Sequence, residues 1–229
     1  MVTFYRERVS QTNWFIVYQY FTSNQEKGKH AGAKFFCRFP YKNAWLPDWS
    51  SMLNKPALQY PKEERLVAEL ERLGIRYLSR QTIIQAKRVR SPQRLIAALI
   101  QQPSSRVRTA AIAIFLANPI FAGSLPGAMQ LLSVSERQTL KLFYTAAVYL
   151  QHKHALRLQA FLGERWQWLP DWYSAELNIV GGQPPDELLT QLGHEQQRMT
   201  GIMANWTGTY ENVAHHLMRR WELEQKWNQ

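Results

Sequence analysis

The sequence predicts a mainly α-helical protein, and three observations lead to that prediction. From residue 61 onward, segments with apolar residues three and four positions apart follow one another. Several begin with residues that favour a helix start, such as Ser91-Pro92 and the pair Ser133 and Glu136. A length of 229 residues with 45% apolar residues is enough to form a buried core. We therefore expect a domain of about six helices.

The chain is expected to divide near residue 60. Residues 1–60 are rich in aromatic residues, and Trp14–Phe21 and Gly32–Phe39 can form the two strands of a β-hairpin. Strict alternation of apolar and polar residues is absent, so a helix over residues 12–38 is the alternative. Residues 61–229 are predicted to form the helical domain, which contains a basic segment at residues 72–108.

Within the helical domain, the start and stop patterns predict where individual helices lie. The stretch from 110 to 117 is apolar on every side, so its helix is expected to be central and buried. The segment 179–185 contains two Gly and two Pro residues and is predicted to be a loop. The expected helices span residues 61–74, 92–102, 106–118, 133–161 and 210–226.

The positive charge is concentrated in one part of the chain. The net charge is +11, and residues 72–135 contain nine Lys or Arg residues and no Asp or Glu. Cations flank two predicted helix starts there, Ser91-Pro92 and Ser104-Ser105, although the positive end of a helix disfavours each of them by ~0.3–1 kcal/mol. Free N–H groups beside arginine are suited to binding phosphate. The arrangement therefore favours an anionic partner.

From this pattern we predict a protein without a catalytic site that binds RNA or DNA through phosphate contacts. No base-reading residues can be identified, so these contacts would set affinity rather than sequence preference. Two alternatives remain. The protein is an interaction subunit, antitoxin-like or part of a larger ribonucleoprotein, and the same arginines contact an acidic protein; or the arginines are solvated or paired with acids from residues 136–229. The predicted contact residues are Arg76, Arg80, Lys87, Arg88, Arg90, Arg94, Arg106 and Arg108.

Cysteine content and hydropathy indicate the compartment. Cys37 is the only cysteine, which excludes a disulfide within the chain and fits a reducing compartment. Residues 109–135 carry no charge, but the uninterrupted apolar run covers only residues 110–117, whereas a membrane span needs ~20 residues. We expect a cytoplasmic protein with a buried helix pair in this region and no membrane partner.

One five-residue motif occurs twice. Trp45-Leu-Pro-Asp-Trp49 recurs identically as Trp168-Leu-Pro-Asp-Trp172. The motif either presents tryptophan to a ligand in two duplicated units, or starts a helix at Pro-Asp while its Trp residues pack. The second interpretation is favoured because Pro at the first helical position and Asp in the first turn both stabilise a helix start.

No catalytic or metal-binding motif is complete. His194-Glu195 begins a metalloprotease pattern, but Arg198 occupies the position of the second histidine. His152 and His154, and likewise the neighbours His215 and His216, have spacings that do not place two rings on one helix face. We therefore predict no catalytic residue, no metal and no cofactor, and keep a metal-independent nuclease as a third hypothesis.

Two stretches carry a resemblance to a known group of proteins. They are Gly74-Ile-Arg-Tyr-Leu-Ser-Arg-Gln81 and Leu140-Lys-Leu-Phe-Tyr-Thr-Ala-Ala-Val-Tyr-Leu-Gln151. Both resemble uncharacterised helical bacterial proteins encoded beside small nucleotidyltransferases, over residues 61–180 at most. The resemblance implies a protein partner and a role in a toxin–antitoxin-like or antiviral defence module. It carries no catalytic residues and does not cover the aromatic N-terminal part.

Overall fold

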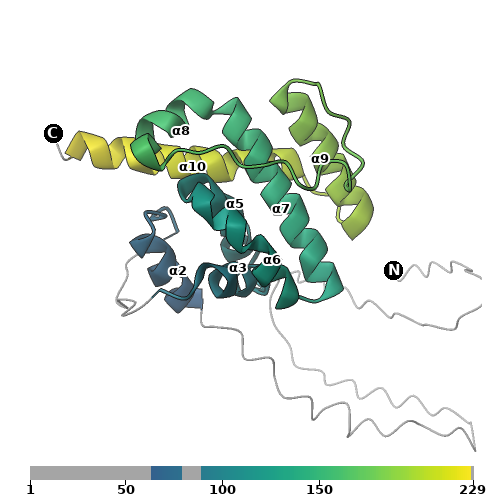
Figure 1. Cartoon of the computed structure of the whole chain (residues 1–229), viewed down its shortest axis with the longest axis horizontal. Coiled ribbons are helices and arrows are strands. Elements are labelled where there is room, and N and C mark those ends of the chain that lie inside the picture. The colour runs from purple at the N-terminus through teal and green to yellow at the C-terminus, as the bar shows by residue number, and fades with distance from the viewer. Residues whose placement is uncertain (1–62, 79–88, 228–229) are drawn as a thin grey trace, which may run out of the picture. The chain divides into compact units, whose positions relative to one another are not determined.

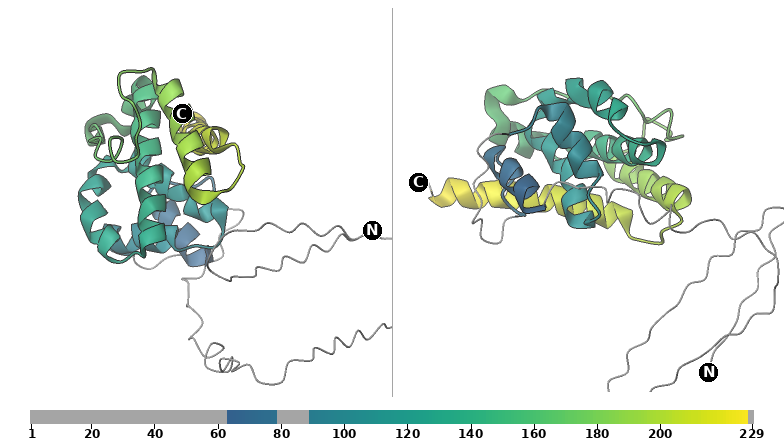
Figure 2. Two further views of the ribbon diagram at one scale, coloured as in Figure 1. Left: turned by 90° about the vertical axis from the view of Figure 1, so that its right-hand side faces the viewer. Right: turned by 90° about the horizontal axis from the view of Figure 1, so that it is seen from below.

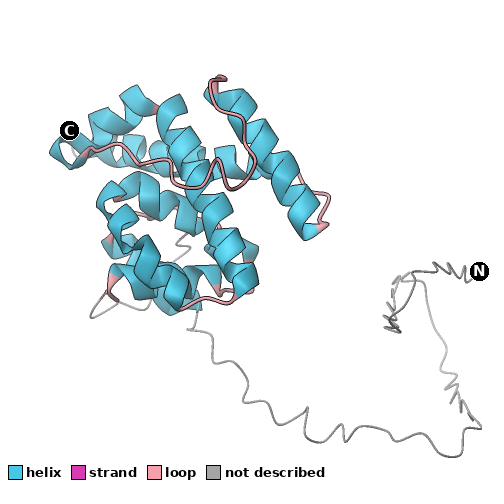
Figure 3. Cartoon of the chain, turned by 45° about the vertical axis from the view of Figure 1, so that its right-hand side comes forward, coloured by secondary structure: helices cyan, strands magenta, loops and turns pink. Residues whose placement is uncertain are grey.

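The computed structural model describes residues 63–78 and 89–227. These residues form helices, turns and loops, with no β-strand among them (Figure 3). The prediction of a mainly α protein is thus confirmed for the described part. The aromatic N-terminal module, its predicted hairpin and the boundary near residue 60 lie outside the described residues.

Two long helices organise the described part. The helix α7 (Val134–Lys153) crosses α10 (Trp206–Trp227), and both pack against α5 (Ala110–Ala117) and α9 (Pro185–Thr200) (Figure 1). The helix α3 (Pro92–Ile100) packs mainly on α6 (Leu125–Gln130). The buried apolar side chains of these helices form one continuous core. In chain order the helices are α2 (Glu63–Arg72), α3 (Pro92–Ile100), α4 (Ser105–Arg108), α5 (Ala110–Ala117), η1 (Pro119–Ser124), α6 (Leu125–Gln130), α7 (Val134–Lys153), α8 (Ala155–Leu162), η2 (Gly163–Arg165), α9 (Pro185–Thr200) and α10 (Trp206–Trp227).

The centre of the core is α5, as predicted. All eight of its residues are buried. The predicted helix over residues 106–118 is divided, however, into α4 and α5, with Thr109 as a turn residue between them. The Thr109 hydroxyl donates a hydrogen bond to the Arg106 carbonyl at 3.2 Å, the kind of local bond by which threonine competes with regular helix geometry.

The uncharged region around α5 bears on the membrane question. No single helix within residues 63–78 and 89–227 has the length and composition to cross a membrane. Ser105–Ala117 and Pro119–Gln130 meet that test only together, as a pair bent by 118°.

The start of α7 follows its predicted capping box. The Ser133 hydroxyl accepts from the Glu136 N–H at 3.4 Å, and the Glu136 carboxylate accepts from the Ser133 N–H at 2.7 Å. The predicted helix over 133–161 is nevertheless two helices, since α7 ends at Lys153 and α8 follows a break at His154. Gly163, with φ of +56°, ends α8.

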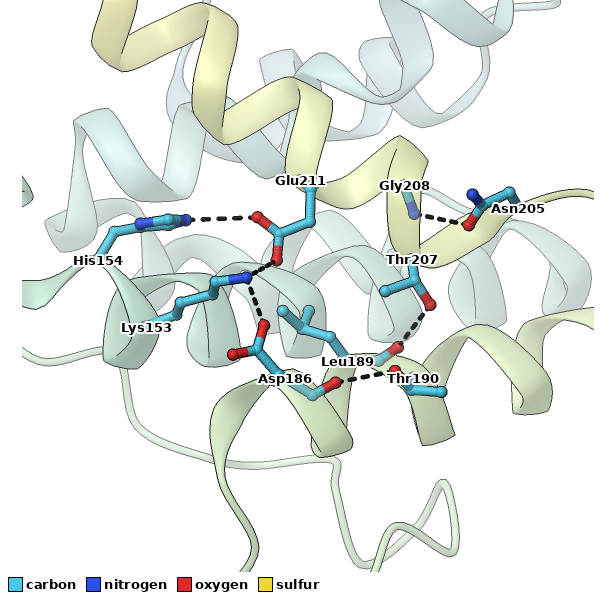
Figure 4. A network of polar contacts seen from close by, with 9 residues as sticks. All are labelled: Lys153, His154, Asp186, Leu189, Thr190, Asn205, Thr207, Gly208 and Glu211. Atoms are coloured by element: carbon cyan, nitrogen blue, oxygen red, sulfur yellow. Dashed lines mark hydrogen bonds and ion pairs between the residues drawn. The ribbon is translucent and has the colours of Figure 1, made fainter.

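A polar network fixes the break between α7 and α8 (Figure 4). Lys153 donates to Asp186, in the first turn of α9, and to Glu211 of α10 at 2.6 Å. His154 Nε2 lies 3.4 Å from the other oxygen of Glu211. The hydrogen bonds from His154 and Lys153 hold the pKa of Glu211 below its ordinary value, against the effect of burial. These contacts join three helices, which gives the network a structural role.

Two helix predictions need correction near the C-terminus. The helix α9 was not predicted, although Pro185 with Asp186 and Glu187 forms a favourable start and Gly201, with φ of +68°, terminates it. The last helix begins at Trp206 rather than 210, and Asn205 accepts from the Gly208 N–H at 2.8 Å in its first turn.

The second copy of the Trp-Leu-Pro-Asp-Trp motif does not begin a helix. Residues 166–172 run along α7 without regular structure, because Gln151 donates to the Gln167 carbonyl at 2.9 Å and accepts from the Leu169 N–H at 2.8 Å. The predicted packing of the Trp residues is only partial: Trp168 stacks on His152 at 4.8 Å and Trp172 on Tyr144 at 5.6 Å, but both side chains remain about half exposed. The first copy, residues 45–49, lies outside the described residues.

Candidate nucleic-acid interface

The predicted contact residues fall into three groups. Arg80, Lys87 and Arg88 lie outside the described residues. Arg76 and Arg90 form ion pairs with acidic side chains. The remaining residues, Arg94, Arg106 and Arg108, have no acidic partner among the described residues.

Arg90 forms the most buried of these ion pairs. Its Nη1 lies 3.3 Å from Oε1 of Glu69, and its backbone N–H donates to Oε2 of the same carboxylate at 3.1 Å. The Glu69 side chain is 0% exposed, and that of Arg90 is 21% exposed. A buried carboxylate without a cation would carry a large desolvation penalty. Arg90 therefore joins the start of α3 to α2.

Arg76 is paired more loosely. Its Nη1 lies 3.4 Å from Oε1 of Glu224 on α10, and its side chain is half exposed. Arg220 donates to the same carboxylate oxygen at 2.9 Å. An exposed pair of this kind contributes only ~0–1 kcal/mol. Arg76 thus pairs with an acid from residues 136–229, as one of the alternative hypotheses predicted.

The unpaired arginines occupy different local settings. Arg94 is exposed in the first turn of α3, whose Ser91 cap makes no side-chain hydrogen bond. The positive N-terminal end of α3 disfavours the charge of Arg94. The same effect is not expected for Arg106 and Arg108, because α4 has only four residues.

Arg106 borders a cavity of about 280 Å³ between α4, α10 and the turn after α2. Its guanidinium donates a hydrogen bond to the Leu78 carbonyl, and its charge has no counterion among residues 63–78 and 89–227. Asn212 and His216 of α10 are exposed, whereas Leu78 and Val213 are buried. None of the eight described residues that line this cavity is acidic. We refer to it as the Tyr77 pocket.

The turn that carries Tyr77 is anchored to α10. Trp221 Nε1 donates to the Gly74 carbonyl at 3.0 Å, and Gly74 adopts a φ of +83°, which glycine tolerates without strain. The Tyr77 ring stacks on His216, with ring centroids 6.0 Å apart and planes 18° from parallel. With the Arg76–Glu224 pair, these contacts hold α2 beside the C-terminal half of α10 (Figure 2).

The Tyr77 hydroxyl is buried and has no hydrogen-bond partner among the described residues. Burial raises the pKa of Tyr77 well above its ordinary value, and the nearby charge of Arg106 opposes this only in part. The hydroxyl therefore stays protonated at physiological pH. A buried unpartnered hydroxyl costs ~1–3 kcal/mol, which a bound hydrogen-bonding group would recover.

Sequence reasoning identified Arg106 but missed the other polar groups of the pocket. His216 was considered only as a metal ligand, and Tyr77 only as part of a resembling stretch. Tyr77 and His216 come from distant parts of the chain, so no local spacing pattern links them. Within the described ranges, no group of three or more His, Cys, Asp or Glu side chains is placed to hold a metal ion.

No protein-family model, curated protein or solved structure matches this chain. The resemblance to helical proteins encoded beside nucleotidyltransferases therefore stays a prediction.

Proposed function

We propose that the protein binds nucleic acid through phosphate contacts at Arg94, Arg106 and Arg108, as a non-enzymatic component of a larger complex. One observation carries the proposal. In a segment with nine cations and no acid, these three arginines have no acidic partner among the described residues. A phosphate can bind them without first displacing a carboxylate, so its attraction is not offset by a broken internal pair.

The paired arginines are not expected to contribute equally. A phosphate that bound Arg90 would leave the buried Glu69 with only the exposed Arg65, 3.5 Å away, as its cation, which is unfavourable. Arg76 is more exposed, and its charge is shared with Glu224. The proposed contact set is therefore narrower than the set predicted from sequence. Arg80, Lys87 and Arg88 remain candidates, because they lie outside the described residues.

The competing proposal is an acidic protein partner, such as the other member of a two-gene toxin–antitoxin-like module. It uses the same unpaired arginines, and the distinction is chemical. Nucleic acid offers a regular series of phosphates with condensed counterions, whereas an acidic protein offers carboxylates. The strength of the salt dependence and the preference between these polyanions separate the two proposals.

The experiment is a salt titration of binding by the full chain, measured by fluorescence anisotropy. The probes are a single-stranded RNA, a single-stranded DNA of the same length, and a polyglutamate peptide of matched charge. Three phosphate contacts predict a slope of log K against log salt of about −2 or steeper for the single strands. The two nucleic acids should bind more tightly than polyglutamate at every salt concentration. Equal or tighter binding of polyglutamate would favour the acidic partner instead.

A further inference from the structure

The Tyr77 pocket contains polar groups whose bonding capacity is unused. The Tyr77 hydroxyl is buried without a partner, and the Asn212 amide makes no hydrogen bond to another described residue. Arg106 uses one of its five N–H donors on the Leu78 carbonyl. His216 stacks on Tyr77, which leaves its ring nitrogens free to bond. The unused groups include several donors and one permanent cation.

These donors fit a phosphate monoester better than a phosphodiester. A monoester carries a charge of about −1.5 to −2 at pH 7 and has three acceptor oxygens, whereas a diester in a nucleic acid strand carries one negative charge. The absence of a carboxylate among the eight described lining residues removes the repulsion that a dianion would meet. Arg106 at the exposed rim can attract the phosphate, and the Tyr77 hydroxyl can donate to an oxygen that enters more deeply.

The size of the pocket also favours a strand end. At about 280 Å³, it falls just below the usual range for small-molecule pockets, ~300–1,000 Å³. This space accommodates a phosphate with part of its nucleoside rather than several nucleotides. Arg94 and Arg108 lie elsewhere on the same basic segment, where the internal phosphates of the strand can bind.

We infer that the Tyr77 pocket binds the terminal phosphate monoester of a nucleic acid strand, with Arg106, Tyr77, Asn212 and His216 as its donors. The inference rests on the proposed function and adds recognition of a phosphorylated end to it. The 5′ and 3′ ends present the same group, so the experiment includes both.

The test compares three versions of one RNA oligonucleotide: 5′-phosphorylated, 3′-phosphorylated and unphosphorylated. The full chain should bind one phosphorylated form about tenfold or more tightly than the unphosphorylated form, because a hydrogen bond to a charged group is worth about that factor. Tyr77→Phe should bring the ratio close to one and leave binding of the unphosphorylated RNA unchanged. Its melting temperature should stay the same or rise, since the lost hydroxyl had no partner.

Tyr173→Phe serves as the matched control, because Tyr173 belongs to the loop along α7 and not to the pocket. It should retain the preference for the phosphorylated end. Salt-dependent binding with no preference for either phosphorylated end would overturn the inference and leave the proposed function standing. A preference that survives Tyr77→Phe would also overturn it. The absence of any salt-dependent RNA binding would overturn both.

Discussion

Arg90 and Arg106 belong to the same acid-free segment, but their surroundings differ. The guanidinium of Arg90 meets the fully buried carboxylate of Glu69, from a helix earlier in the chain. The guanidinium of Arg106 donates to the backbone carbonyl of Leu78, has no acidic partner in the described part of the chain, and borders the open Tyr77 pocket. A count of charges along the sequence treats the two as equivalent. Their difference shows that the placement of the few acids decides which of these cations form an internal ion pair.

The largest effect should come from breaking the buried pair. Replacing Glu69 with Gln leaves Arg90 without a counterion, and removing one partner of a buried pair costs about 3 kcal/mol or more. We expect Glu69→Gln to lower the free energy of unfolding by about 3 kcal/mol in urea denaturation. Glu63→Gln, at the exposed start of the same helix, should cost at most ~1 kcal/mol. Equal effects of the two changes would show that the Arg90 pair is not structural.

Arg106→Ala should have a smaller effect on stability. The change removes a hydrogen bond to the Leu78 carbonyl but leaves no buried charge unpaired, so the expected loss is about 1 kcal/mol. RNA affinity should fall at the same time, and the salt slope should become shallower by about 0.7. Unfolding measurements and anisotropy titrations on the same preparation check both parts. A stability loss as large as that of Glu69→Gln would place Arg106 in the structural group.

Arg94→Ala is expected to change the stability least of the three single variants, and to raise it rather than lower it. A cation in the first turn of α3 opposes the helix dipole, so its removal should stabilise the protein by ~0.3–1 kcal/mol. The salt slope should again fall by about 0.7. A thermal melting curve checks the change in stability, and a salt titration of RNA binding checks the change in slope. Destabilisation by Arg94→Ala would mean that the arginine has a folding contact, contrary to its exposed position.

The sequence predicted those features that depend on neighbouring residues. The burial of α5 follows from eight consecutive apolar residues, and the start of α7 follows from the Ser133–Glu136 capping box. The breaks at Thr109 and His154 were not predictable from Gly or Pro, because neither residue is present there. At His154 the break coincides with contacts to α9 and α10, which only the folded chain provides.

The candidate site was predictable only in part for the same reason. The segment that contains Arg94, Arg106 and Arg108 stood out because it has no acids. The pairing of Arg90 with Glu69 and the stacking of Tyr77 on His216 both join residues from different helices or turns. No short-range spacing encodes such contacts. The sequence therefore indicated a region of positive charge. The fold then showed which of its described arginines pair with an acidic side chain and which do not.

The central claim is that the unpaired arginines bind phosphates and are not needed for folding. The most direct test is the variant Arg94→Ala/Arg106→Ala/Arg108→Ala, with RNA-binding salt slope and melting temperature measured together. We expect the slope to become shallower by about 2, because three phosphate contacts on a single strand are lost. The melting temperature should change little, since the loss at Arg106 is partly offset by the gain at Arg94. An unchanged salt slope, or a variant that unfolds before it can bind, would contradict the account.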